Sequence, residues 1–108
     1  MLFRPESETK VQMSAWSVRE VSSPLDDETT QHLVGVVDGY GRVCSPIQEF
    51  DRETMTVTTR SGKLYELIGP PGVDIDAEYV FKNWCRMNGV TELINVTAAQ
   101  YWNEAFSK

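Results

Sequence analysis

His32 is the only histidine in the chain, so any acid–base or nucleophilic chemistry that needs an imidazole would have to use it. A Ser-His-Asp arrangement would draw its serine from Ser17, Ser45 or Ser61, and none of these lies in a GxSxG motif. A lone histidine at the start of an apolar segment, with no acid beside it, is typical of a structural residue. The sequence therefore predicts no catalytic residue and favours a protein that is not an enzyme.

Three acidic residues at alternate positions, Asp74, Asp76 and Glu78, resemble the oxygen-rich loops that bind Ca²⁺. The turn glycine and the distant bidentate glutamate of such loops are missing, whereas acids at the start of a helix complement the helix dipole. Residues 69–72, GPPG, also lack the GK[ST] ending of a phosphate-binding loop. We therefore expect neither a metal ion nor a cofactor.

The two cysteines, Cys44 and Cys85, fall in an expected strand and on the apolar face of an expected helix. Small hydrophobic side chains occupy such positions, so we expect two buried free thiols. The first ten residues contain no apolar core of a signal peptide, and no stretch approaches the roughly 20 apolar residues of a membrane span. These features predict a cytoplasmic protein that does not bind a membrane.

The 108 residues and the 41% hydrophobic content suit one folded domain with one core. Residues 1–10 mix Pro, Glu, Ser and Thr, so we expect a disordered N-terminus, followed by a single domain over residues 11–108. The net charge is -6 and the Lys and Arg residues are scattered, so phosphate backbones should be repelled. Direct binding to nucleic acid is not expected.

Runs of β-branched and aromatic residues between turn residues predict five strands. The expected strands occupy residues 11–21, 31–39, 42–50, 54–60 and 61–69, with a surface turn over residues 22–30. In the first strand Met13 is out of phase with Trp16 and Val18, as a β-bulge would make it. Pro46 cannot donate to a ladder, so the third strand should be an edge or bend at that residue.

The last two strands should form a hairpin whose register follows from its loop. A three-residue loop over residues 60–62 places Gly62 at the left-handed position that such loops need, and it sets Val57 opposite Tyr65. A two-residue loop would set Val57 against the charged Glu66. The expected register is therefore 59:63, 57:65 and 55:67.

Helical spacing of apolar residues predicts a helix that begins at an Asp76 N-cap and ends before Gly89. A second helix should begin at Thr97, because Thr97 and Gln100 form a capping box. Residues 90–96 between the two helices are either a strand or an extended connector. Strands followed by helices indicate an α+β fold. We predict a curled antiparallel sheet of about five strands, in a meander, followed by two C-terminal helices.

The segments GRVCSPIQEFD and TTRSGKLYELIGPPGVDIDAEYVFKNWCRMNGVTE resemble a group of small bacterial proteins of uncharacterised activity, often carried near mobile genetic elements. The resemblance lies between Arg42 and Glu92. It implies a bacterial, cytosolic protein with an accessory role. It implies no activity and no catalytic residue.

Three classes of function remain open. The first is a protein-interaction or self-assembling module, possible as a homodimer, that binds through an edge strand or through the C-terminal aromatic residues Tyr101, Trp102 and Phe106. The second is a small-molecule binding protein or small enzyme. Its cavity would lie inside the curled sheet, near Trp16, Arg60 and Tyr65. The third is an acidic inhibitor of a nucleic-acid-binding protein. Composition favours the first class.

Overall fold

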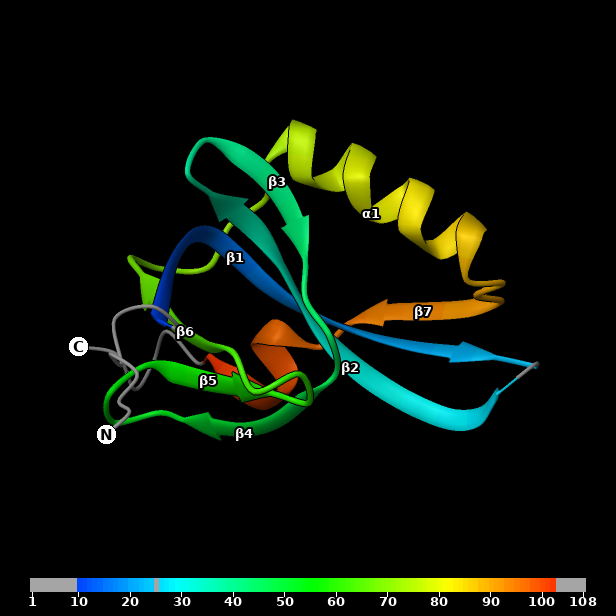
Figure 1. Cartoon of the computed structure of the whole chain (residues 1–108), viewed down its shortest axis with the longest axis horizontal. Helices are drawn as coiled ribbons and strands as arrows, with labels where there is room; N and C mark the ends of the chain where they lie inside the picture. The colour runs from blue at the N-terminus through cyan, green and yellow to red at the C-terminus, as the bar shows by residue number, and fades with distance from the viewer. Residues whose placement is uncertain (1–9, 25, 103–108) are drawn as a thin grey trace, which may run out of the picture.

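The computed structural model describes residues 10–24 and 26–102 (Figure 1). The described chain forms seven strands, one α-helix and one short π-helical turn. In chain order the elements are β1 (Lys10–Ser23), β2 (Asp26–Val37), β3 (Tyr40–Val43), β4 (Ile47–Asp51), β5 (Thr56–Thr59), β6 (Leu64–Ile68), α1 (Ile75–Met87), β7 (Glu92–Asn95) and η2 (Thr97–Tyr101). All seven strands belong to one mixed sheet.

β1 is the central strand. One of its edges pairs antiparallel with β2 between Ser14 and Ser23. The other edge, which we call the divided edge, has two successive partners. On the divided edge, residues 10–14 pair parallel with β6 and residues 19–22 pair antiparallel with β7. β6 and β7 therefore leave a gap between them, over residues 15–18 of β1.

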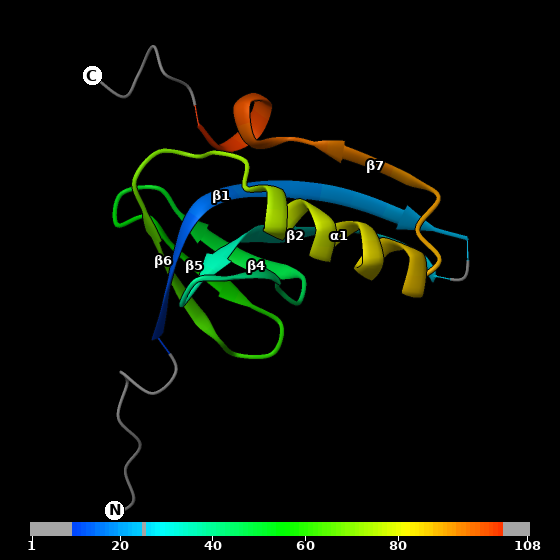
Figure 2. The same ribbon diagram turned by 90° about the horizontal axis from the view of Figure 1, so that it is seen from above.

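The sheet curls around the larger of two hydrophobic clusters. Its strand order is β3-β2-β1-β6-β5-β4, and residues 44–46 join the two ends of this order (Figures 1 and 2). The backbone N–H of Cys44 donates to the Leu33 carbonyl at 3.0 Å, and that of Arg60 donates to the Pro46 carbonyl at 2.8 Å. The buried members of the enclosed core are Met13, Trp16, Val18, Leu33, Val37, Cys44, Val57, Tyr65, Leu67 and Val96.

A β-bulge in β1 lets Met13 and Trp16 both face the enclosed core. Ala15 has φ 47°, and the register with β2 shifts at this point. Both core side chains are 0% exposed. Gly35 on β2 lies so near that a Cβ there would come within 2.7 Å of the Met13 side chain. The predicted bulge is confirmed, and the close approach requires glycine on the neighbouring strand.

α1 covers the opposite face of β1, β2 and β3, where it buries Ala77, Phe81 and Cys85 (Figure 2). The Asp74 side chain accepts a hydrogen bond from the backbone N–H of Ala77 at 3.0 Å, so Asp74 is the N-cap. The predicted N-cap, Asp76, is therefore wrong by two residues. Gly89 has φ 66° and ends the helix as predicted.

The predicted fold, an antiparallel meander of about five strands followed by two helices, is wrong. The described chain is mostly sheet, with seven strands, and β1 and β6 run parallel. The second helix is replaced by the five-residue turn η2. The hydroxyl of Thr97, which the capping box needed, instead accepts a hydrogen bond from the backbone N–H of Val18 at 2.8 Å. Residues 90–96, for which the sequence allowed either a strand or a connector, contain the strand β7.

Two predicted segments are also wrong. Residues 22–30 are mostly strand, because β1 and β2 continue to pair as far as Ser23 and Asp26. The predicted strand 42–50 is divided into β3 and β4 by a bend at Ser45, so the single strand is wrong, whereas the interruption expected beside Pro46 is present. Of the predicted disordered N-terminus, Lys10 belongs to β1 and residues 1–9 lie outside the described residues.

The hairpin register is confirmed. Val57 lies opposite Tyr65. The backbone N–H of Thr59 donates to the Lys63 carbonyl at 3.0 Å, and that of Leu67 donates to the Met55 carbonyl at 2.9 Å. Gly62 has φ 91°, the left-handed conformation that the three-residue loop required.

Candidate functional site

The structure does not bring together the three residues predicted to line a cavity. Trp16 and Tyr65 are buried members of the enclosed core. Arg60 lies outside it, where its side chain is 53% exposed and pairs with Glu28 at 3.0 Å. The curled sheet therefore uses Trp16 and Tyr65 as packing residues.

Two of the predicted interface aromatics pack within the chain. The Tyr101 ring lies 4.5 Å from that of Phe50, and its hydroxyl donates to the side chain of Gln31. The Trp102 ring lies 6.0 Å from that of Trp16, edge to face. Phe106 lies outside the described residues. Tyr101 and Trp102 thus help to close the core.

His32 is buried and held at both ring nitrogens. Nδ1 lies 2.8 Å from the Cys44 carbonyl, which can only accept, so Nδ1 carries the hydrogen. Nε2 lies 2.7 Å from the Thr30 hydroxyl and accepts from it. Burial lowers the pKa of His32, and the charge of Arg60 lowers it further, against the opposing effect of the Cys44 carbonyl. The ring is a neutral structural group with no free nitrogen for catalysis.

The two cysteines are free and buried, as predicted. Burial raises the pKa of Cys44 to about 11, and it also raises that of Cys85. Thiolate is the nucleophilic form, so neither side chain is reactive near neutral pH. Burial likewise raises the pKa of Tyr65 to about 12, beside Cys44.

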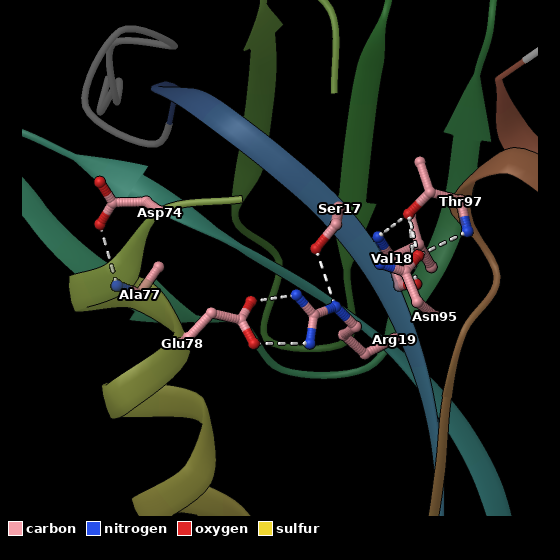
Figure 3. A network of polar contacts seen from close by, with 8 residues as sticks. All are labelled: Ser17, Val18, Arg19, Asp74, Ala77, Glu78, Asn95 and Thr97. Atoms are coloured by element: carbon pink, nitrogen blue, oxygen red, sulfur yellow. Dashed lines mark hydrogen bonds and ion pairs between the residues drawn. The ribbon is translucent and has the colours of Figure 1, made fainter. Parts of the chain in front are cut away.

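A partly buried ion pair joins β1 to α1 (Figure 3). The Arg19 side chain, 8% exposed, binds both carboxylate oxygens of Glu78, with Nη1 3.2 Å from Oε1. The same guanidinium stacks over the Phe81 ring, 5.0 Å from its centroid, and its Nε donates to the Ser17 hydroxyl at 2.9 Å. The ion pair fixes the helix against the sheet and leaves the Arg19 charge neutralised.

A hollow of about 590 Å³ opens beside Ser17, and we call it the Ser17 hollow. It lies at the gap between β6 and β7 on the divided edge of β1. The residues that line it are Ser17, Pro71, Gly72, Val73, Asn95, Thr97, Ala98 and Trp102. The described residues of its lining contribute hydroxyl, amide and indole groups but no carboxylate.

The Asn95 amide on this lining has a fixed orientation (Figure 3). Its Oδ1 accepts from the backbone N–H of Thr97 at 3.0 Å and lies 2.6 Å from the Thr97 hydroxyl. The Thr97 hydroxyl itself accepts from the backbone N–H of Val18. Because Oδ1 faces Thr97, the Nδ2 amide group of Asn95 points away from it.

β7 is the second candidate site, because no described strand pairs with its outer edge. It pairs with β1 alone among the described strands and runs along the outside of the sheet in Figure 2. All four of its residues are exposed, and Leu93 and Ile94 are 55% and 57% exposed. The only charged side chain in β7 is that of Glu92. Exposed apolar residues on an unpaired edge are a binding surface for another strand.

Comparison with known proteins found no matching family model, no matching curated protein and no matching solved structure. The resemblance to bacterial accessory proteins therefore stays a prediction. Within residues 10–24 and 26–102, no three His, Cys, Asp or Glu side chains are grouped to hold a metal ion. None of the helices in the same ranges is long and apolar enough to cross a membrane.

Proposed function

We propose that this protein is a non-catalytic protein-interaction module that self-associates through the open edge of β7. The supporting observation is the exposure of Leu93 and Ile94 on a strand whose outer edge has no described partner. Edge strands that avoid pairing carry Lys, Pro or a bulge, and β7 has none of these. With no described strand on its outer edge, β7 extends the sheet across two copies in this proposal.

The hydrogen-bond pattern of β7 defines the register of such a dimer. The backbone N–H of Val96 donates to β1 at 3.0 Å. Inward and outward positions alternate along an antiparallel strand, so Ile94 also faces β1 and Leu93 directs its backbone groups outward. A two-fold axis beside Leu93 then pairs this residue with Leu93 of the second copy. The acidic Glu92 falls opposite Ile94 of that copy, so like charges stay apart.

This proposal moves the interface from the C-terminal aromatics to β7. Tyr101 and Trp102 are half-buried against the chain's own core, which leaves less of their surface for a partner. β7 offers apolar side chains and backbone groups together. The proposal also keeps the cytoplasm as the compartment, where buried free thiols stay reduced.

Sedimentation equilibrium of the wild-type chain and of Leu93→Lys tests the proposal. We expect a wild-type dimer at micromolar concentration and at least about tenfold weaker association for the variant, about 1.4 kcal/mol. Met87→Lys is the matched control, because Met87 is 83% exposed and lies on α1. A monomeric wild-type chain, or equal weakening by both lysines, would contradict the proposal.

A further inference from the structure

The Ser17 hollow lies where β1 changes partner along its divided edge. Before the hollow, β1 pairs with β6, and after it β1 pairs with β7. Between them, the backbone N–H of Gly72 donates to the Trp16 carbonyl at 3.0 Å, and Thr97 reaches Val18. Neither contact fills the space beside Ser17. At this point the edge of β1 faces the hollow and its lining residues instead of a neighbouring strand.

Three lining residues supply hydrogen-bond donors that the described chain does not use. Ser17 is 2% exposed, and its hydroxyl must accept from Arg19, because a guanidinium can only donate; its own hydrogen stays available. The Nδ2 group of Asn95 points away from Thr97 and has no acceptor within the described residues. The Trp102 Nε1–H is buried and likewise has no acceptor there.

An unmatched buried donor carries an unrepaid desolvation cost, so a ligand that supplies an acceptor oxygen gains from pairing with Ser17 and Trp102, whereas the exposed Asn95 adds a further donor at the rim. The remaining walls are apolar, from Pro71, Val73 and Ala98. The space of about 590 Å³ lies within the range of small-molecule sites. No carboxylate is found among the described lining residues, and the Arg19 charge is already neutralised by Glu78.

From the unused donors and apolar walls of this lining, we propose that the Ser17 hollow binds a small acyl compound, a carboxamide or a carboxylate, that carries a short aliphatic group. The acyl oxygen accepts from Ser17, Asn95 and Trp102, and the aliphatic group lies against Pro71 and Val73. This proposal does not depend on self-association, because the hollow and its donors belong to one copy of the chain.

Titration of the ¹⁵N-labelled full chain with isobutyramide, and separately with isobutyrate, tests the proposal. We expect the indole N–H resonance of Trp102 to move downfield and to saturate, while that of Trp84 stays in place. Trp84 is the control because it packs on His32, away from the hollow. Trp102→Phe and Trp84→Phe assign the two resonances. Saturation by only one of the two probes identifies the acyl class; saturation by neither overturns the proposal.

Asn95→Asp separates the donor role of Asn95 from its structural role. Aspartate keeps the oxygen that Thr97 needs but removes the Nδ2 donor and adds a negative charge. We expect binding at least about tenfold weaker, with the larger loss for isobutyrate. Asn88→Asp is the matched control, because it makes the same change outside this lining. Equal affinities in the two variants, with both chains folded, would overturn the proposal.

Discussion

At the scale of single residues, the partly buried pair of Arg19 and Glu78 is a charged link between sheet and helix. Glu78→Ala would leave the Arg19 charge buried and unpaired, so we expect a loss of about 3 kcal/mol in the free energy of unfolding. Arg19→Met should cost less, because the apolar side chain packs on Phe81 and Glu78, one-third exposed, stays hydrated. Urea unfolding measures both, and a larger loss for Arg19→Met would contradict this order.

The neutral form of His32 predicts a pH dependence of stability. Folding lowers the pKa of this residue below its ordinary 6.5, so the unfolded chain binds the proton first. The stability that neutral His32 contributes is therefore fully present above about pH 7. It is lost as the pH falls through 6.5 toward the lower pKa of His32 in the folded chain. Urea unfolding between pH 7.5 and 5.5 measures the loss. As His32 is the only histidine, His32→Gln should flatten the profile; an unchanged slope would contradict this assignment.

Some residue roles could be read from the sequence and others could not. The phase break at Met13 predicted the bulge, and the positions of Cys44 and Cys85 predicted buried thiols. Ser17 and Arg19 gave no such signal, because polar residues at alternate positions of a strand indicate a solvent-facing side. α1 covers that side, and Glu78 compensates the charge from a site distant in sequence. Of the donors at the Ser17 hollow, Ser17 is the one that contacts this pair, through Arg19 Nε.

At the scale of elements, the contact of α1 with β3 depends on Gly41. A Cβ on Gly41 would come within 2.7 Å of the Ala77 Cα, which is backbone and cannot rotate away. Gly41→Ala should therefore push the helix outward and cost about 1–3 kcal/mol of stability. Gly72→Ala is the control, because its Cβ would meet Ala15 at an ordinary 3.6 Å. Similar thermal midpoints for the two variants would contradict the close packing of α1.

Elements that depend on local sequence were predicted better than elements that depend on distant partners. The hairpin around Gly62 was correct because loop chemistry and apolar pairing agree over a few residues. The second helix was wrong because Thr97 bonds to Val18, far away in the chain. Whether residues 92–95 form a strand could not be predicted for the same reason. They form β7 because they pair with β1. Its four-residue pattern carries too little periodicity to show this.

At the scale of the whole molecule, charge should oppose the proposed self-association. Each copy carries a net charge of -6, so two copies repel one another at low ionic strength. Salt screens this repulsion, with a Debye length of about 10 Å at 0.1 M. We expect the dimer to strengthen between about 0.05 and 0.5 M NaCl, as measured by sedimentation. Weaker association at high salt would show that ion pairs, rather than Leu93 and Ile94, hold the copies together.

The most direct test of the β7 interface is a disulfide between two copies of Leu93→Cys. In the proposed register the two residues form a hydrogen-bonded antiparallel pair, with Cα atoms about 5.5 Å apart, a separation that a disulfide spans. Cys44 and Cys85 are buried and do not compete. Under mild oxidation at micromolar concentration, Leu93→Cys should form a covalent dimer, while Met87→Cys stays monomeric, although Met87 on α1 is the more exposed residue, at 83% against 55%. Equal yields from both variants, or no dimer from Leu93→Cys, would contradict the interface.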